Sequence, residues 1–373
     1  MKRILVTSTW FPSKYFPFNG DFVQRFAISL SKVVNVTVLH VISYESVKKI
    51  KINTKQVNEN YKEIIVYLPS FKPSFINPIL RMFFYLKLSF QQKNIDFIHS
   101  NIVYTDSLWL FLSKIIFKKQ YYLTEHWTNY DTKSGFKLPL WQKLLAKLIF
   151  SQAKCVFPVS ESLQNGMNGN GIYAKFKIIP NIVNTDIFKP TTEIKVNKIK
   201  VFLHVSSLNQ DQKNILGILE TFEKLYENKF PFILKIIGDD SDDLVKNFIK
   251  KHQLQEVILF IGLISHQEVA SYMKTSDCFV LFSNYENQPC VIGEAFSCGL
   301  PVIATDVGGI SEYFPDNFGF IINKNNEKEL FKKCIKVIKH HQFSTKEKMN
   351  EYVKNTFSEQ IIINQYIEEY LIK

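Results

Sequence analysis

Short runs of β-branched and aliphatic residues alternate along the whole chain with segments whose apolar residues recur at helical spacing. Such alternation indicates stacked βαβ units, which build parallel sheets covered by helices. The 373 residues exceed the roughly 250 to 300 residues at which a single core stops growing, so two domains are expected. The sequence therefore predicts an α/β protein with two domains, each built around a parallel sheet.

The strand pattern runs through one series and then restarts. We expect strands in the first half at residues 3–8, 36–41, 64–68, 96–101, 121–124, 155–159 and 177–179, and in the second half at residues 200–205, 232–237, 257–261, 278–282, 301–304 and 319–322. Residues 180–198 between the two series are polar and contain two prolines, which is typical of an interdomain linker. We therefore predict domains at 1–190 and 191–355, and a C-terminal helix at 356–373 that packs back toward the N-terminal domain.

The charge is distributed unevenly between the halves. Residues 1–190 contain 25 Lys and Arg against 10 Asp and Glu, a net charge of +15, whereas residues 191–373 contain 21 against 24, a net charge of −3. A basic half favours an anionic partner such as a membrane surface, a phosphorylated acceptor or a nucleic acid. An AT-rich genome would also explain the abundant Lys, Asn and Ile.

The N-terminus and the cysteines bear on where the protein works. The first twelve residues contain two basic residues and a short apolar run without a small-residue cleavage site, so a first strand is expected rather than a signal peptide. The five cysteines form no C-x-x-C pair and show no zinc-ligand spacing. No apolar stretch approaches the roughly 18 residues of a membrane span. We expect a cytoplasmic protein with free thiols and no bound metal.

The densest signal for a site is SNYENQPCVIGEAFSCGLPVIATDVGGISE, residues 283–312. It begins where an expected strand ends, and open α/β sheets bind ligands at the carboxyl ends of their strands. Pro289 suits the first turn of a helix, which would leave the amides of Cys290, Val291 and Ile292 free. Free amides and the helix dipole make an anion site suited to a diphosphate.

Two glutamates flank seven residues of this segment. Glu286 is expected in the loop before the helix and Glu294 inside it, so one carboxylate can meet sugar hydroxyls while the other accepts hydrogen bonds from a ribose diol. By themselves, two glutamates at this spacing are usually surface residues. Here Gly308 and Gly309 follow a second buried strand and permit close approach of the backbone to a ligand, which favours a binding role.

Three further residues are candidates from their positions in loops. Lys213 follows the strand at residues 200–205 and opens a helix, which places a cation near the diphosphate, although an isolated lysine is ordinarily just solvated. Gly20 lies in the loop after the first strand, but this loop lacks G-x-G-x-x-G and so argues against a dinucleotide site. His126 ends another strand and is either a buried structural histidine or a hydrogen-bonding group near the reacting sugar.

With these motifs identified, the chain resembles the retaining glycosyltransferases of the GT-B architecture known as family 4 or group 1. The resemblance is strongest over residues 199–322 and rests on the string E-x-x-P-x-x-x-x-E-A-x-x-x-G-x-P-V-I-A-x-x-x-G-G, which runs from Glu286 to Gly309. A supporting match is Gly238-Asp239 after the second strand of the second half. The resemblance implies two Rossmann-like domains with parallel sheets facing across an interdomain cleft.

The resemblance also implies an activity. The enzyme would be a metal-independent hexosyltransferase that moves a sugar from a UDP- or GDP-sugar to a glycan or lipid-linked acceptor in bacterial surface polysaccharide biosynthesis. Glu294 would bind the ribose, Glu286 and His126 would lie near the sugar, Lys213 would neutralise the diphosphate, and Gly20 would lie near the phosphates. The other expected donor-binding residues are Ser207, Gly238, Asn287, Gln288, Pro289, Cys290, Val291 and Ile292. No cofactor is implied, because protein cations and amides stabilise the departing diphosphate.

The chain departs from the family pattern at two places. The family usually has Gly-Arg where this chain has Ser206-Ser207, so one of two expected phosphate-binding cations is missing. Removing one preorganised donor typically costs about 2.7 to 4 kcal/mol of transition-state stabilisation, unless another basic residue compensates. Asn287 stands where the family has Gly after the first glutamate, which could change the sugar hydroxyls that are recognised.

Other interpretations remain open. A nucleotide-sugar epimerase or a phosphorylase has a related architecture, although no pyridoxal-lysine context is found. A non-enzymatic nucleic-acid-binding protein would use the basic half, but no recognised motif accompanies that charge, so no nucleic-acid partner is expected. Residues 71–90 and 138–150 are either ordinary domain helices with snorkelling lysines or segments that contact the inner face of the cytoplasmic membrane.

Overall fold

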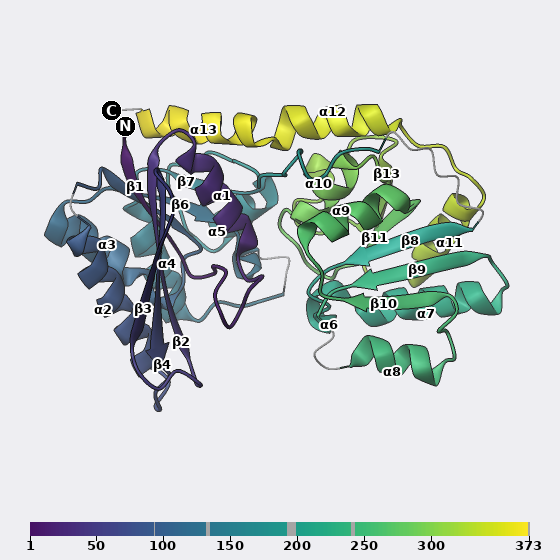
Figure 1. The fold of residues 1–373 in the computed structure, drawn as a ribbon, viewed down its shortest axis with the longest axis horizontal. Coiled ribbons are helices and arrows are strands. Elements are labelled where there is room, and N and C mark those ends of the chain that lie inside the picture. The colour runs from purple at the N-terminus through teal and green to yellow at the C-terminus, as the bar shows by residue number, and fades with distance from the viewer. Residues whose placement is uncertain (93, 132–134, 192–198, 240–242, 372–373) are drawn as a thin grey trace. The chain divides into compact units, whose positions relative to one another are not determined.

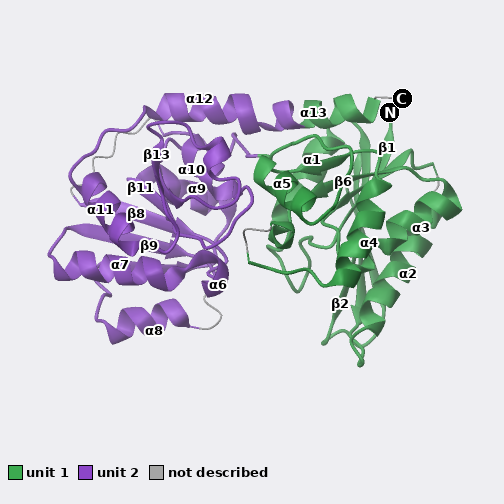
Figure 2. Cartoon of the chain, turned by 180° about the vertical axis from the view of Figure 1, so that it is seen from behind, with its two compact units in different colours: residues 1–182, 363–373 green, residues 183–362 purple. Residues whose placement is uncertain are grey.

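The structure is a computed structural model that describes residues 1–92, 94–131, 135–191, 199–239 and 243–371 (Figure 1). The chain forms two compact units, unit 1 with residues 1–182 and 363–373 and unit 2 with residues 183–362 (Figure 2). Each unit is an α/β structure around one mainly parallel sheet, which confirms the predicted fold class. Within the described residues, none of the helices has the length and apolar composition needed to cross a membrane.

The sheet of unit 1 has seven strands in the order β3-β4-β2-β1-β5-β6-β7. They are β1 (Arg3–Ser8), β2 (Asn35–Tyr44), β3 (Lys51–Asn58), β4 (Tyr61–Pro69), β5 (Phe97–Asn101), β6 (Tyr121–Glu125) and β7 (Val156–Pro158). All neighbouring strands are parallel except β3 and β4, which are antiparallel. Apart from the edge strand β3, the order is that of a doubly wound sheet whose topological switch point lies between β1 and β5.

Helices cover both faces of this sheet. They are α1 (Asp21–Ser31), α2 (Ile76–Gln91), α3 (Leu108–Phe117), α4 (Leu140–Ser151) and α5 (Glu161–Gly169), with short 3-10 turns η1 (Thr105–Ser107) and η2 (Thr128–Tyr130). Helices α2, α3 and α4 cover one face, where Tyr85, Leu110 and Ile149 share a core with Leu5 and Ile98 of the strands. Helix α1 covers the opposite face, on which the ring of Phe26 lies 4.9 Å from that of His99.

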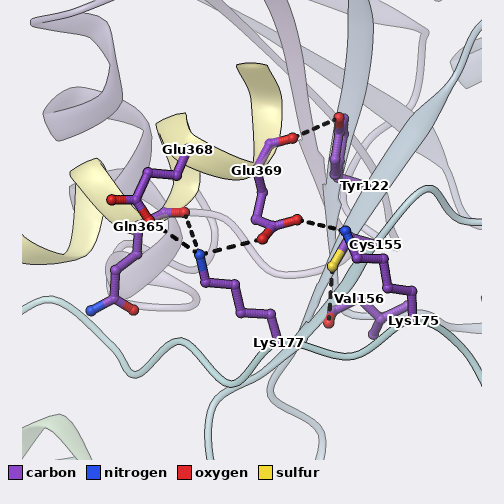
Figure 3. Close-up of polar contacts among 8 residues, drawn as sticks. All are labelled: Tyr122, Cys155, Val156, Lys175, Lys177, Gln365, Glu368 and Glu369. Atoms are coloured by element: carbon purple, nitrogen blue, oxygen red, sulfur yellow. Dashed lines mark hydrogen bonds and ion pairs between the residues drawn. The ribbon is translucent and has the colours of Figure 1, made fainter. Parts of the chain in front are cut away.

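The end of helix α13 (Glu359–Leu371) completes this second face of unit 1. The Tyr370 ring lies 4.7 Å from Phe97, and its hydroxyl lies 2.6 Å from His99 Nδ1. Around it, Lys175 Nζ donates to Glu369 Oε2 at 2.9 Å, and Tyr122 Oη donates to the Glu369 carbonyl at 3.2 Å (Figure 3). Tyr370, near the end of α13, is therefore part of the core of unit 1.

The sheet of unit 2 has six parallel strands in the order β10-β9-β8-β11-β12-β13. They are β8 (Lys200–Val205), β9 (Phe232–Ile237), β10 (Ile258–Gly262), β11 (Cys278–Leu281), β12 (Val302–Thr305) and β13 (Gly319–Ile322). Counted from β8, the spatial order is 3-2-1-4-5-6, which is the Rossmann order, with its switch point between β8 and β11.

Two helix layers enclose the sheet of unit 2. The helices are α6 (Gln210–Lys213), α7 (Ile215–Glu227), α8 (Leu244–Lys251), α9 (His266–Thr275), α10 (Cys290–Ser297), α11 (Glu327–Ile338) and α12 (Lys346–Phe357), with a 3-10 turn η4 (Ser311–Tyr313). Helices α7, α8 and α11 pack on one face, and α9, α10 and α12 pack on the other. Successive strand residues point to opposite faces of the sheet: Phe202 belongs to the first of these cores and Leu203 to the second. Such a strand is buried on both faces, as is usual in a parallel sheet.

Two of the strand predictions were wrong. Strand β3 was not predicted, because all of its side chains are exposed and it lacks the apolar alternation that marks a half-buried strand. Residues 177–179 do not form a strand. The amides of Lys177 and Ile179 donate to carbonyls of β7 at 3.0 and 3.1 Å, yet the only strand-type bridge described there is an isolated one between Val156 and Phe176.

The chain passes from unit 1 to unit 2 at Ile182–Val183, which is earlier than the predicted boundary at residue 190. The Val183 amide donates to the Phe357 carbonyl at 2.9 Å, and Phe188 is buried in unit 2 with its carbonyl accepting from Ser297 Oγ at 2.5 Å. Residues 183–191 of the expected linker thus belong to unit 2, whereas residues 192–198 lie outside the described residues. The predicted single C-terminal helix is interrupted at Ser358, whose extended backbone ends α12.

Candidate functional site

The switch point of unit 2 brings together two loops with predicted site residues. Strands β8 and β11 are neighbours, and the chain leaves their carboxyl ends through residues 206–209 and 282–289. Ligands of open α/β sheets bind in the crevice outside such strand ends. Lys213 and Glu286, which are 73 positions apart in the sequence, meet there.

Lys213 and Glu286 form an ion pair with a hydroxyl neighbour. Lys213 Nζ lies 2.5 Å from Glu286 Oε1, and the same oxygen accepts from Ser283 Oγ at 2.8 Å. The two charged side chains are only 13% and 6% exposed, so water screens this pair less than a surface pair. Ser283 was not singled out from the sequence, although it begins the segment that carries the motif.

The backbone around Lys213 is fixed by two successive helix caps. Asn209 Oδ1 accepts from the Gln212 amide at 2.9 Å at the start of α6. Asn214 adopts the left-handed conformation with φ 48° and accepts from the Gly217 amide at 3.3 Å, which starts α7. An asparagine side chain suits both positions, because its oxygen satisfies amides that a helix start leaves free. Lys213 thus lies at the junction between the two helices.

The loop after β12 packs against the backbone of Glu286. Gly308 has φ 57°, and a Cβ atom there would lie 1.8 Å from the Glu286 carbonyl oxygen. The Gly309 amide donates to the Asn287 carbonyl at 2.8 Å, and Thr305 Oγ1 donates to the Ser283 carbonyl at 2.7 Å. The two glycines of the motif therefore serve this loop contact, because no larger residue fits at position 308.

The start of α10 differs in detail from the prediction. Pro289 is the N-cap residue with φ −70° and ψ 116°, one position before the first turn. The Ile292 amide donates to the Pro289 carbonyl at 3.2 Å, so the prediction that this amide is free was wrong. Cys290 and Val291 are half-buried at the helix start, and Gln288 is buried in the loop before them. The positive end of the α10 dipole still points to this loop.

Glu294 lies more than one turn into α10 and is buried. Its neighbour Gly293 faces Val183, since a Cβ atom at Gly293 would lie 2.8 Å from Val183 Cγ2. This close packing fixes α10 against the segment that enters unit 2. A carboxylate on a fixed helix is a suitable acceptor for two neighbouring hydroxyls.

The loop after β8 shows why serine stands where the family has Gly-Arg. Burial lowers the pKa of His204 to about 4, so the ring is neutral at pH 7. His204 Nδ1 donates to the Val280 carbonyl at 2.8 Å, which leaves Nε2 to accept from the Ser206 hydroxyl at 2.7 Å. Ser206 Oγ in turn accepts from the Leu208 amide at 3.0 Å. Ser206 is thus structural, whereas Ser207 is exposed at the strand end.

Gly238 follows β9 next to this loop. A Cβ atom at Gly238 would lie 2.2 Å from the Ser206 carbonyl oxygen, so the backbones of the two strand ends approach closely. The structure therefore gives Gly238 a packing role within the edge that holds Lys213 and Glu286.

The predicted residues of unit 1 form a second group. Gly20, with φ 70°, is the N-cap of α1, and a Cβ atom there would lie 2.3 Å from the Trp10 carbonyl oxygen. The Phe22 ring on the same helix lies 4.6 Å from the His126 ring. Burial lowers the pKa of His126 to about 3, partly offset by a hydrogen bond with Asn181. The predicted first-half residues thus meet at the carboxyl edge of the sheet, with His126 as a neutral imidazole.

A buried carboxylate that the sequence analysis did not select supports this edge. Glu125 Oε1 accepts from the amides of His126 and Trp127, both at 2.8 Å, and Oε2 accepts from the Val103 amide at 3.0 Å. Burial raises the pKa of Glu125 to about 7, against the opposite effect of these three bonds. The side chain ties the end of β6 to the loop after β5. Only its adjacency to His126 could have indicated this role.

Within the described ranges, no three His, Cys, Asp or Glu side chains come close enough together to hold a metal ion. All five cysteines lie in described segments as free thiols, and Cys290 is the least buried of them. The loops at the switch point of unit 2 present the Lys213 ammonium, the start of α10 and the carboxylate of Glu286.

Two Rossmann-type sheets with loops of this kind define the class of GT-B glycosyltransferases. Solved structures share the fold over the whole chain. Sucrose-phosphate synthase from Thermosynechococcus elongatus gives a TM-score of 0.80 at 16% identity and covers 99% of this chain and 98% of its own. Anabaena HepE in complex with UDP gives a TM-score of 0.74 at 17% identity and covers 100% and 99%.

Sequence models place the chain within this class. The model described as Glycosyltransferase Family 4 matches residues 22–187, and the model described as Glycosyl transferases group 1 matches residues 187–356. The chain belongs to the family 4 glycosyltransferases. An uncharacterized glycosyltransferase of Methanocaldococcus jannaschii is 24% identical over 91% of this chain and 90% of its own. The Escherichia coli UDP-Gal:alpha-D-GlcNAc-diphosphoundecaprenol alpha-1,3-galactosyltransferase is 31% identical over 41% and 42%.

Proposed function

We propose that the enzyme transfers a hexose from a nucleoside diphosphate sugar to a glycan or lipid-linked acceptor, with retention of anomeric configuration and without a metal ion. The observation that carries this proposal is the Lys213–Glu286 ion pair at the switch point of unit 2, next to the start of α10. A cation, a helix dipole and two buried carboxylates at one sheet edge match the groups of a nucleotide sugar: a diphosphate, a ribose and a hexose.

The ion pair suits a lysine that receives a leaving group. An ammonium group has three N–H donors, so Lys213 can keep one on Glu286 and direct another to a phosphate oxygen. In the free enzyme, Glu286 balances a charge that would otherwise be buried alone. When the bond to the sugar breaks, negative charge grows on the diphosphate, and the preorganised cation and helix dipole stabilise it.

The comparisons support UDP as the nucleotide. HepE has been solved with UDP and with UDP-glucose, and the Escherichia coli relative is named for UDP-Gal. Glu294 is the proposed ribose-binding group, because it is a fixed carboxylate inside the helix whose N-terminus receives the diphosphate. In this proposal, unit 2 holds the donor, and the His126 edge of unit 1 lies on the side of the acceptor and the transferred sugar.

We also propose that an acceptor contacts the rim of a small pocket in unit 1, whose volume of about 10 Å³ has room for one water molecule. It lies between the loops after β5 and β6 and helix α4, and its lining includes Tyr104, Trp127, Tyr130 and Gln142. The Tyr104 and Trp127 rings are 5.2 Å apart in an edge-to-face arrangement. Aromatic rings and an amide at the rim are groups that can contact a sugar. The name of the Escherichia coli relative and a similar solved structure, the lipopolysaccharide outer core galactosyltransferase WaaB, favour a role in bacterial surface polysaccharides.

A thermal-shift screen of UDP, GDP and ADP with their common sugars tests the proposal, since a ligand that binds only the native state raises the unfolding temperature. We expect UDP and one UDP-sugar to stabilise the protein with and without EDTA. With that sugar and candidate acceptors, NMR should show a product with the anomeric configuration of the donor. Inversion, loss of activity in EDTA, or interconversion of the free donor sugar without an acceptor would contradict the proposal, and the last result would indicate an epimerase.

A further inference from the structure

The layer formed by α2, α3 and α4 on one face of unit 1 has an unusual composition. These helices, Ile76–Gln91, Leu108–Phe117 and Leu140–Ser151, contain no Asp or Glu, whereas each contains at least one Lys. Helix α3 packs against both α2 and α4, so the three form one continuous layer (Figure 2). Its inner side is part of the unit 1 core, and its outer side is available to a partner.

The outer side of α2 is apolar along its length. Exposed large side chains recur at Phe75, Ile79, Phe83 and Phe90, which is the spacing of one helix face. Lys87 lies within this row, with its Nζ 5.9 Å from the centre of the Phe83 ring. The basic residue at the other side of the helix, Arg81, is engaged with buried Asp106 at 2.6 Å. An ordinary surface helix would have polar residues in such a row.

Helix α4 repeats the pattern more strongly. Leu140 is 73% exposed, Trp141 56% and Leu144 58%, and Leu148 continues the same row. Lys147 is exposed beside them, and Lys143 is half-exposed. Between the two rows, α3 adds exposed Ile115 and Ile116 and is followed by exposed Lys118.

The other helices of the unit differ in composition. Helix α1 on the opposite face begins with Asp21, α5 begins with Glu161, and the end of α13 carries Glu368 and Glu369. The basic excess of the N-terminal half is thus combined with exposed apolar rows on the α2–α4 layer. Soluble proteins rarely leave a large contiguous apolar surface without a partner.

We propose that the outer face of the α2–α4 layer is a peripheral membrane-binding surface that recognises anionic lipid. The apolar rows of α2 and α4 insert to the depth of the headgroup–acyl boundary, with Trp141 at the interface, while the lysines contact lipid phosphates. Trp, Phe and Leu flanked only by Lys are the composition of interfacial helices. Each Lys near an anionic surface adds to the attraction, and the absence of carboxylates removes repulsion.

The layer also continues toward the proposed acceptor pocket. Leu138, Gln142 and Leu145 of α4 and the residues just before it line that pocket, while Trp141 and Leu144 on the same helix face outward. A membrane-bound α4 would therefore hold the pocket close to the lipid headgroups. This step rests on the proposed function, whereas lipid binding by the layer does not.

Vesicle flotation tests the surface directly. The wild-type protein should float with phosphatidylglycerol vesicles and bind phosphatidylcholine vesicles at least tenfold more weakly. Trp141→Ser combined with Leu144→Ser should reduce the partition coefficient at least tenfold, and so should Lys143→Glu combined with Lys147→Glu. Tryptophan emission should shift to shorter wavelength on binding, and Trp141→Phe should remove most of this shift, because Trp109 is buried in the core and Trp10 and Trp127 lie outside the three helices of the layer.

Matched controls lie on unit 2. Tyr226→Ser with Leu263→Ser removes two exposed apolar side chains, and Lys250→Glu with Lys251→Glu reverses two exposed charges; both should bind vesicles like the wild type. All variants should keep the thermal shift given by UDP, which separates failure of this inference from failure of the proposed function. Absence of vesicle binding, equal binding to both lipids, or sedimentation as a dimer that only the Trp141→Ser variant disrupts would overturn the inference. The last result would identify a second copy as the partner.

Discussion

At the scale of single residues, the Lys213–Glu286 pair has a structural role beside the proposed catalytic one. Each charge is almost buried, and each is the main compensation for the other, with Ser283 as an additional donor. Removing one partner of such a pair leaves a buried charge, which costs more than the pair contributes. The lysine that we propose for the diphosphate is therefore also expected to stabilise unit 2.

Lys213→Ala should lower the free energy of unfolding by about 2 to 3 kcal/mol, toward the lower end of the cost of a broken buried pair, because the site is partly open to water. Lys213→Ala combined with Glu286→Gln should recover more than half of that loss, since no charge remains uncompensated. Urea unfolding followed by circular dichroism gives both values. Equal stability of the single and double variants would show that the carboxylate does not depend on the lysine.

At the scale of elements, loops and helix ends are held by contacts whose strengths differ widely. The loop at Gly308 has no room for a side chain under Glu286, whereas Gly262 has a comparable φ of 85° with nothing within 4 Å of its Cβ position. Both positions strain an L-residue, but only Gly308 adds a collision with backbone. The end of α13 also makes two kinds of contact, the ion pair of Glu369 with the mostly exposed Lys175 and the packing of the buried Tyr370 ring.

Gly308→Ala should displace the Glu286 loop and weaken UDP-sugar binding at least tenfold, whereas Gly262→Ala should leave binding unchanged. Both variants should lose about 1 kcal/mol of stability from the left-handed backbone alone, and Gly308→Ala should lose more. Calorimetric titration and thermal unfolding of the two proteins measure these effects. Similar binding by both would mean that the loop contact does not order the donor site.

Tyr370→Ala should cost about 3 to 5 kcal/mol, because it removes a buried ring and its hydrogen bond to His99 from the core of unit 1. Glu369→Gln should cost less than about 1 kcal/mol, since Lys175, its partner, is mostly exposed and such pairs contribute little. All four tryptophans lie in unit 1, so their fluorescence in urea reports this unit. The reverse order of costs would show that the ion pairs hold α13.

Sequence patterns predicted the strands and helices in which buried apolar side chains recur at a regular spacing. Apart from β3, the strands of both sheets were predicted to within a few residues, because most of their side chains are buried or half-buried, and the motif string located the Glu286 loop and α10. Exposed β3 has no such period, and the unit boundary depends on distant contacts such as Val183 with Phe357. Family resemblance suggested that Lys213 and Glu286 share a site, but only the fold shows that they are paired.

At the scale of the whole molecule, buried neutral histidines make stability depend on pH. Burial lowers the pKa of His99 from 6.5 to about 3, because an imidazolium would lose its water inside the core. A base whose pKa is lower in the folded state adds stability above pH 6.5, and this stability is lost as the pH falls, at a limit of about 1.4 kcal/mol per pH unit. Glu125, whose pKa is raised to about 7, has the opposite dependence.

His99→Gln should reduce the loss of unit 1 stability between pH 6.5 and pH 5.5 by about 1 kcal/mol, because the unfolded chain then gains one proton fewer. Tryptophan fluorescence in urea at the two pH values measures this difference for unit 1. A pH dependence equal to that of the wild type would show that folding does not lower the pKa of His99.

The central claim is that the switch point of unit 2 holds the donor diphosphate through Lys213 and its ribose through Glu294. Calorimetric titration of UDP into the wild type, Lys213→Ala and Glu294→Ala tests it most directly, with Lys250→Ala as a control on the exposed surface of the same unit. We expect at least tenfold weaker binding for the first two variants and unchanged binding for the control. UDP affinity that is the same in all four folded proteins would contradict it.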